Sequence, residues 1–220
     1  MHHLLYFFLL LLLPFSSQAQ GYITLQDKPF EFSHSLDQEL WSWLEKQEGF
    51  SALNKDQQLM YYWTNLFRKD PKAFHETVVK EFLRQFPEAN TPAAKSLEKD
   101  ISAAKGPLPY LAPDAGLLQM SRLQAKDLAG RNGVISHIST DGKNFNQRIK
   151  EAGQYRCGAE NVFSGSGNPL EALILLLIDH GVPNKGHRLN LLDPSFGKMG
   201  AALSASSAKK TVLVQVFACK

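Results

Sequence analysis

The chain is poor in the short motifs that usually indicate a metal site or an activated nucleophile. Its 220 residues include only two cysteines, and neither Cys-x-x-Cys nor His-x-x-x-His spacing occurs. Any metal would therefore be held by residues far apart in the sequence. The Gly-x-Ser-x-Gly turn that exposes a nucleophilic serine is also absent. A Ser139 or Ser164 nucleophile with His137 and Glu160 has suitable residue types, but neither serine lies in such a turn.

No apolar run is long enough to span a membrane. The longest covers twelve residues, 4–15, whereas a membrane-spanning helix needs about 20. Ser17-Gln18-Ala19 follows as a small-x-small pattern, so we expect residues 1–19 to be a cleaved secretory signal. This predicts a secreted or periplasmic protein without a stable membrane span. An uncleaved anchor is the alternative, because His2 and His3 stand where Lys or Arg is usual. No Cys follows the run, which argues against a lipoprotein.

Blocks of like charge are missing as well. The formal net charge is +3, and no basic run has aromatic residues interleaved with it. Nothing therefore indicates a nucleic-acid partner. The chain that remains after signal cleavage is long enough for one domain with a substantial core.

The two cysteines both lie in the expected mature chain. An even count in an oxidising compartment favours a disulfide, and Cys157 precedes one expected strand while Cys219 ends another. We predict a Cys157–Cys219 disulfide, with two buried free thiols as the alternative. The plausible disulfide partner argues against Cys157 as a nucleophile.

Hydrophobic spacing predicts helices first and strands late in the chain. Asp37, Asn54 and Asp114 are placed to cap helices, and Gly49 to end the first of them. The expected helices are residues 37–47, 54–70, 71–86, 117–131, 145–152 and 189–192, with an apolar helix at 170–178 that should be buried against a sheet. The expected strands are residues 161–163, 199–203 and 211–217. Residues 90–113 read as a loop with one short polar helix.

Two histidines and a glutamate in residues 137–187 are the candidate site. His137 precedes a Ser-x-Asp-Gly turn, so its ring should project from irregular backbone. Glu160 lies at the start of a strand, where a partly buried carboxylate needs a partner, either Arg148 or Arg188. His187 begins a short helix, whose dipole disfavours added positive charge and so favours the neutral, metal-binding imidazole. A purely structural role for each of these residues is the alternative.

The order of these residues resembles the CAP superfamily, the cysteine-rich secretory, antigen 5 and pathogenesis-related-1 group, in its bacterial form. The likeness runs from about Gln57 to Phe217. It rests on five motifs in family order, which are Trp-Thr-Asn-Leu-Phe-Arg from 63, His-Ile-Ser-Thr-Asp-Gly from 137, Ala-Glu-Asn from 159, Gly-His-Arg-Leu-Asn-Leu-Leu-Asp-Pro-Ser-Phe from 186, and Val-Gln-Val-Phe from 214.

This resemblance implies an α+β fold, a mixed three-layer α-β-α sandwich of the CAP type with a small central antiparallel sheet and extra N-terminal helices. We expect a signal peptide at residues 1–19, an N-terminal extension at 20–55 and the CAP domain at 56–220. Relative to the compact family pattern, an insertion is expected at about 87–113.

The resemblance also implies a cavity lined by His137, Glu160 and His187. The family cavity usually has a second acidic residue, and Asp179 is the candidate for it, with His180 a weaker one. His137 and His187 would then bind zinc or another divalent cation weakly, because two imidazoles without a firm third ligand suit weak binding.

Three functions are compatible with these residues. We favour a binding protein whose cleft takes a small apolar ligand, a lipid or a cell-envelope component, with metal optional. The second is a metal-assisted hydrolase in which His137 and His187 hold zinc and Glu160 activates its water. The third is a structural or adhesive envelope module that uses Trp41, Trp43 and residues 61–63 as a contact surface, although these aromatic residues are better explained as core.

Overall fold

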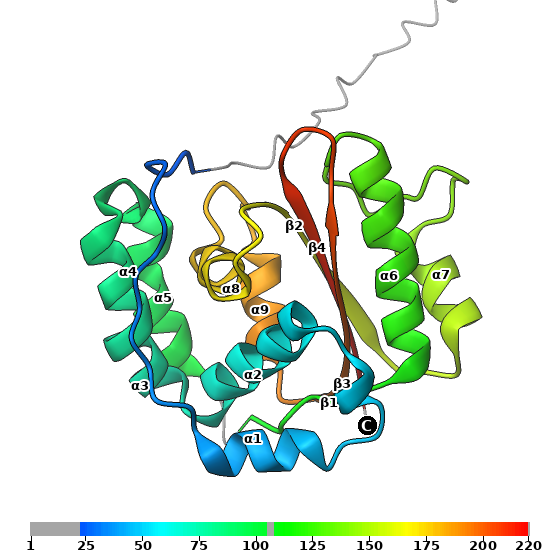
Figure 1. Cartoon of the computed structure of the whole chain (residues 1–220), viewed down its shortest axis with the longest axis horizontal. Coiled ribbons are helices and arrows are strands. Elements are labelled where there is room, and N and C mark those ends of the chain that lie inside the picture. Colours follow the sequence, from blue (N-terminus) through cyan, green and yellow to red (C-terminus); the bar gives the residue numbers. More distant parts are fainter. Residues whose placement is uncertain (1–22, 105–107, 220) are drawn as a thin grey trace, which may run out of the picture.

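A computed structural model describes residues 23–104 and 108–219, so the expected signal peptide and its cleavage site lie outside the described residues. A four-stranded sheet crosses the middle of the molecule in the order β1-β3-β4-β2 (Figure 1). Its strands are β1 (Ala112–Pro113), β2 (Gly158–Gly165), β3 (Phe196–Ala205) and β4 (Thr211–Cys219). The three long strands pair antiparallel, as expected, and only the two-residue β1 adds a parallel edge.

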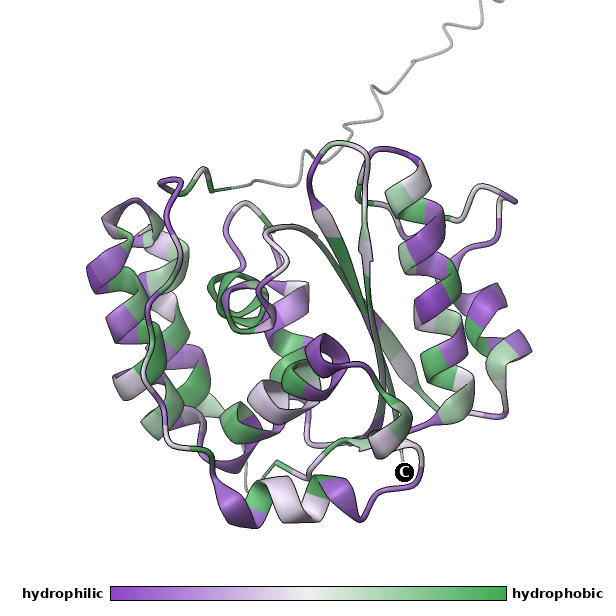
Figure 2. Cartoon of the chain, in the orientation of Figure 1, coloured by the Kyte–Doolittle hydropathy of each residue, from purple (hydrophilic) through white to green (hydrophobic). Residues whose placement is uncertain are grey.

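Helices cover both faces of the sheet and complete the predicted three-layer α+β sandwich (Figure 1). One face packs on α6 (Ala115–Gly130), with α7 (Phe145–Ala152) beside it. The other face packs on α2 (Lys55–Lys69), α8 (Pro169–Ile178) and α9 (Gly186–Leu192). Figure 2 shows α8 as mostly hydrophobic, and the helix is buried between the sheet, α2 and a third group of helices, as its sequence predicts.

This third group lies beyond α2 and α8. It contains α3 (Pro71–Phe74), a π-helical turn η2 (His75–Val79), α4 (Lys80–Gln85), the 3₁₀ turn η3 (Pro87–Ala89) and α5 (Pro92–Ala103). The single helix expected over residues 71–86 is therefore interrupted by a π turn. The short polar helix expected after Pro92 instead buries Ala94, Leu97 and Ile101, so part of the expected insertion contributes to the core.

The expected N-terminal extension packs onto the domain. It contains α1 (Gln38–Glu45) and the 3₁₀ turn η1 (Phe50–Ala52), and Phe30, Leu40 and Phe50 belong to the main core cluster. The aromatic residues that an adhesive surface would use lie in the same region. Tyr61 and Tyr62 are fully buried, while Trp41, Trp43 and Trp63 are partly buried against this core.

Local capping signals set several helix boundaries. The side chains of Asp37, Asn54 and Asp114 each accept a hydrogen bond from a backbone N–H in the first turn of α1, α2 and α6. The helix expected to reach Gln47 ends earlier, at Glu45, and Gly49, in the left-handed region, is the N-cap of η1 rather than the end of α1.

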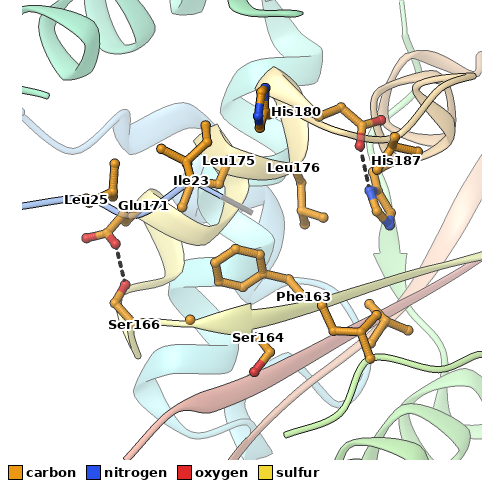
Figure 3. Close-up of a pocket in the computed structure, with 15 residues that line it drawn as sticks. Ile23, Leu25, Phe163, Ser164, Ser166, Glu171, Leu175, Leu176, His180 and His187 are labelled. Carbon is orange, nitrogen blue, oxygen red and sulfur yellow. Dashed lines mark hydrogen bonds and ion pairs between the residues drawn. The ribbon is translucent and has the colours of Figure 1, made fainter. Parts of the chain in front are cut away.

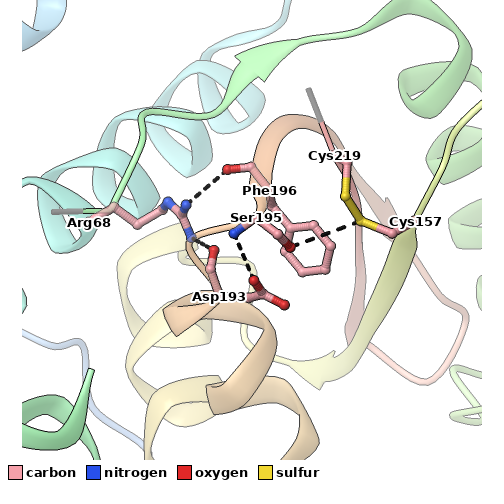
Figure 4. Close-up of a disulfide and its surroundings, with 6 residues drawn as sticks. All are labelled: Arg68, Cys157, Asp193, Ser195, Phe196 and Cys219. Atoms are coloured by element: carbon pink, nitrogen blue, oxygen red, sulfur yellow. Dashed lines mark hydrogen bonds between the residues drawn. A yellow bond between two sulfur atoms is a disulfide. The ribbon is translucent and has the colours of Figure 1, made fainter. Parts of the chain in front are cut away.

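A buried arginine fixes the segment that leads from α9 into β3. Arg68 donates to the carbonyl oxygens of Pro109, Leu191, Asp193 and Phe196 over 2.7–3.1 Å. Figure 4 shows its guanidinium group reaching Asp193 and Phe196. Burial lowers the pKa of Arg68 to about 10. These hydrogen bonds fix the path of the chain between α9, which carries His187, and β3.

Candidate functional site

Strand β2 positions two neighbouring residues of the site on opposite faces of the sheet. Successive side chains of a strand point in opposite directions, so Glu160 and Asn161 face different layers. Glu160 contacts Arg148 of α7, whereas Asn161 donates to the backbone oxygen of His187 in α9 at 3.3 Å. The two histidines of the predicted site therefore contact adjacent residues of β2 from opposite sides of the sheet, His137 at Glu160 and His187 at Asn161.

Glu160 lies in a buried ion pair with Arg148. Nη2 of Arg148 is 2.8 Å from Oε1 and 2.7 Å from Oε2 of Glu160, and the exposed fractions of the two side chains are 9% and 1%. The sequence left Arg148 and Arg188 as alternative partners for Glu160, and the structure shows that the partner is Arg148. Its Nη1 also reaches Gln124 Oε1 at 3.2 Å and the His137 carbonyl at 3.3 Å.

His137 lies at the solvent edge of this ion pair. Its Nδ1 is 2.9 Å from Glu160 Oε1, and 47% of its side chain is exposed. The ring projects from irregular backbone after α6, as predicted, and the following turn closes through a Ser139 N–H to Lys143 carbonyl bond of 2.9 Å. Ser139 Oγ donates to Gln124 Oε1 at 2.7 Å, so it is engaged away from the His137 ring.

His187 forms a second histidine–carboxylate pair with Asp179. His187 is in the first turn of α9, and its Nδ1 lies 2.7 Å from Asp179 Oδ1. Oδ2 of the same carboxylate accepts the backbone N–H of Arg188 at 3.1 Å. Asp179 adopts the left-handed region at φ 54° at the end of α8, which turns its fully buried carboxylate towards α9. His180 lies nearby but makes no comparable pair within the described residues.

Arg188 has a structural role. Its fully buried guanidinium donates to the carbonyls of Leu177, Ile178 and Ala93, each at 2.7 Å, and to Asp100 Oδ2 at 2.6 Å. It therefore joins α9 and α8 to α5, which belongs to the third group of helices. Arg188 has both carbonyl oxygens and a carboxylate as partners, and Glu160 is not one of them.

The two imidazoles are the candidate metal ligands of the predicted site. Each imidazole bonds a carboxylate through Nδ1, which leaves Nε2 as the nitrogen that would carry the lone pair for a metal. Within residues 23–104 and 108–219, no group of three or more His, Cys, Asp or Glu side chains is arranged to hold a metal ion. Water would have to complete the coordination of an ion bound by one or both imidazoles.

An open cavity of about 230 Å³ lies along β2, and it separates the predicted residues into two groups. Asp179, His180 and His187 line this cavity, whereas His137 and Glu160 are not among its lining residues. Its walls are otherwise largely apolar and include Ile135, Val162, Phe163, Leu175, Leu176 and Val182. The structure thus places only half of the predicted site in this cavity.

The far end of the cavity contains residues that the sequence analysis missed. Ser166 Oγ donates to Glu171 Oε1 at 2.7 Å, and Ile23 and Leu25 of the N-terminal segment form part of the wall. Figure 3 shows Glu171 and His187 at opposite ends, with Phe163 between them. Glu171 is the only charged residue in the apolar stretch 170–178, and this isolated charge was the available signal.

A second, larger cavity of about 690 Å³ opens between α6, α7 and the turn at residues 139–143. Met120 and Leu123 contribute apolar surface, and Arg148 lines the cavity while it pairs with Glu160. Charged side chains, including Asp127, also line it.

The predicted disulfide is confirmed. Cys157 and Cys219 are bonded, with Cα atoms 5.5 Å apart, and they join the start of β2 to the end of β4 (Figure 4). Their backbones are also joined by a Cys219 N–H to Cys157 carbonyl bond of 3.3 Å. The sulfur of Cys157 is therefore not available as a thiolate nucleophile.

Comparison with protein-family models gives a match over residues 61–219 to the family described as CAP, the cysteine-rich secretory protein family. No curated protein matches. One similar solved structure is an extracellular protein containing an SCP domain from Bacillus anthracis, with a TM-score of 0.48 and 19% identity, covering 86% of this chain but 45% of that one. This chain thus spans less than half of that protein. Another is an outer surface protein from Borrelia burgdorferi, with a TM-score of 0.44 and 20% identity, covering 69% of this chain and 96% of that one.

Proposed function

Because the chain belongs to the CAP family of cysteine-rich secretory proteins, we propose that it is a secreted or periplasmic binding protein whose cavity along β2 takes an apolar group. The observation that supports this proposal is the lining of the cavity. Aliphatic and aromatic side chains form most of its walls, with the Ser166–Glu171 pair near one end and His187 at the other (Figure 3). Binding pockets commonly combine apolar walls with a few polar groups that orient the ligand.

The size of the cavity limits the group that it accepts. Pockets that enclose a drug-sized ligand have volumes of roughly 300–1,000 Å³, and this one is about 230 Å³. It accommodates a small apolar ligand, or one apolar portion of a larger lipid or envelope component.

Two observations favour binding over metal-assisted hydrolysis. Both oxygens of Glu160 accept hydrogen bonds from Arg148, and one of them also faces His137, so this carboxylate is occupied rather than poised to activate water. Only the His187–Asp179 pair lines the cavity. A hydrolase would need the two histidine pairs to act on one bound molecule.

The binding proposal is tested with the apolar fluorophore N-phenyl-1-naphthylamine. The half-buried Leu175 lines the cavity along β2, and Leu175→Asp should weaken binding by about tenfold, because a carboxylate in the apolar wall opposes entry of an apolar group. Leu123→Asp in the second cavity is the matched control and should leave the affinity unchanged. Near-UV circular dichroism checks that both variants fold. Loss of binding only in Leu123→Asp would assign the fluorophore to the other cavity and contradict the proposal.

Weak zinc binding is a second part of the proposal. It is tested by isothermal titration of zinc into the native protein and the His137→Ala, His187→Ala double variant. Affinity should fall in the double variant, and it should also fall on acidification, because protonated imidazole cannot bind a metal. Equal affinity in the two proteins would show that these histidines do not bind zinc, and only the apolar binding site would remain of the proposal.

Export is tested by mass spectrometry of the protein recovered from cells. A mature chain that begins at Gln20 is expected, because Ser17 and Ala19 are the small residues that signal peptidase accepts. An intact Met1 terminus in the membrane fraction would show instead that the protein keeps its N-terminal segment as a membrane anchor. The described residues include no helix with the length and hydrophobicity for crossing a membrane.

A further inference from the structure

We propose that the ligand of the β2 cavity is an extended peptide segment, which binds by adding as a strand to the outer edge of β2. The inference rests on the proposed binding function and names the class of ligand. Strand addition to a sheet edge is a general mode of peptide recognition, in which main-chain hydrogen bonds give affinity and alternate side chains enter pockets.

The cavity lies against the backbone edge of β2. It is lined by five consecutive residues, Val162, Phe163, Ser164, Gly165 and Ser166, of which the first four belong to the strand. Because alternate residues of a strand face opposite ways, a cavity that contacts both sets must reach around the strand edge. β2 is the last strand in the sheet order, and β4 covers its other edge. In the described part of the chain, no strand pairs with the edge that faces the cavity.

Both rows of side chains on a bound strand would meet apolar surface. On the side of α6, the cavity offers Ile135 and Val162. On the side of α8, it offers Phe163, Leu175 and Leu176. A peptide paired with β2 would point successive side chains to these two sides in turn. The small volume of the cavity is consistent with a few side chains of a longer segment that continues into solvent.

The chain's own N-terminal segment shows the kind of peptide that fits. Ile23 and Leu25 lie two residues apart in a segment without helical structure, and both contribute to the cavity wall (Figure 3). Contacts further along hold this segment in place, including the Gln26 N–H to Glu88 Oε1 bond of 2.7 Å and the buried ring of Phe30. An aliphatic side chain at every second position of an extended chain is therefore compatible with this surface.

Charge also disfavours an acidic segment. The cavity lining contains no Lys or Arg among the described residues, and its two carboxylates already have partners. Glu171 accepts from Ser166, and Asp179 is bonded to His187. An acidic peptide side chain would lose its hydration without gaining a Lys or Arg partner in this part of the site.

The experiment uses fluorescence anisotropy with the full chain and a labelled peptide, Lys-Ile-Thr-Leu-Thr-Ile-Lys, whose core repeats the Ile-Thr-Leu pattern of residues 23–25. Two N-methylated forms are compared, each with methyl groups on alternate amides. A strand pairs with one neighbour through only every second residue, so methylation of one set should weaken binding by about tenfold or more and methylation of the other set by less than about twofold. Equal affinity of both forms, or no binding of the unmodified peptide, would overturn the proposal.

A pair of protein variants locates the peptide. Ile135→Asp places a charge in the cavity wall and should weaken the unmodified peptide by about tenfold. Ile138→Asp is the matched control, because Ile138 is 53% exposed and does not line the cavity. The naphthylamine titration separates the two hypotheses. If the cavity binds the fluorophore but not the peptide, strand addition is wrong and apolar binding stands. If the peptide fails to displace bound fluorophore, the peptide does not occupy this cavity.

Discussion

Removal of the Glu160 carboxylate should destabilise the protein strongly. Glu160→Ala leaves the Arg148 guanidinium buried without a counter-charge, although Nη1 keeps its contacts with Gln124 and the His137 carbonyl. Loss of one partner of a buried ion pair typically costs about 3–5 kcal/mol. For a domain of this size, each kcal/mol lowers Tm by about 2–4 °C, so the expected decrease is about 6–20 °C.

The assay is urea unfolding followed by intrinsic fluorescence, with the disulfide intact. Glu151→Ala is the control on the same side of the molecule, because Glu151 pairs with Lys143 at 2.9 Å with 58% and 41% of the side chains exposed. Exposed pairs of this kind contribute about 0–1 kcal/mol. The Glu160→Met, Arg148→Met double variant should recover much of the loss, since neither charge then remains buried.

The refuting result is a small loss in Glu160→Ala. If its free energy of unfolding falls by less than about 1 kcal/mol, as in the Glu151 control, the ion pair is not a structural support of the site. Failure of the double variant to recover stability would show that the remaining contacts of Arg148, rather than charge balance, dominate.

Three further outcomes follow from the fold. Replacement of both cysteines by serine should lower the free energy of unfolding by about 2–4 kcal/mol in urea titrations, and an unchanged midpoint would contradict a stabilising disulfide. Gly200→Ala should lower the free energy of unfolding by about 1–3 kcal/mol in a thermal scan, because a Cβ there would lie 2.1 Å from the backbone of α6. Gly130→Ala is the control and should not lower it, because a Cβ at that position meets nothing within 4 Å. Asp37→Ala should cost about 1 kcal/mol at neutral pH. The hydrogen bond from the Leu40 amide helps to hold the pKa of Asp37 below its usual value. The native protein should therefore have the higher free energy of unfolding above about pH 4, and this difference from Asp37→Ala should disappear as the pH falls below that value. A difference in stability that is independent of pH would argue against the cap.

Much of the fold could be predicted because its signals are local. The caps at Asp37, Asn54 and Asp114 depend on hydrogen bonds within one helical turn, and each is present. The helix at residues 145–152 has the predicted bounds, with Gly153 following it. The strands extend beyond their predicted ends because pairing with β4, rather than residue type alone, carries β2 from Gly158 to Gly165.

The π turn and the early end of α1 could not be derived in this way. Apolar residues recur at every fourth position over residues 74–86 (Phe74, Val78, Phe82 and Phe86), and this spacing predicts a continuous helix. The π turn η2 (His75–Val79) interrupts it without any proline or glycine in the turn. Helix propensity does not distinguish i→i+4 from i→i+5 bonding, so packing has to decide. The ion-pair partner of Glu160 was undetermined for a similar reason, because Arg148 and Arg188 are equivalent in residue type and differ only in tertiary position.

The division of the candidate site follows from the geometry of β2. Glu160 and Asn161 are adjacent in sequence, and alternation sends their side chains to opposite layers, where each contacts a different histidine. The family resemblance grouped His137 with His187, but it does not show on which side of a strand a ring lies. A ligand that contacts both rings must therefore reach around the edge of β2, and this edge is the surface that the cavity exposes.

The effects of replacing His137 and His187 one at a time should consequently differ. His187→Ala should change binding in the cavity that its ring lines, whereas His137→Ala should act mainly on the loop that Glu160 and Arg148 hold.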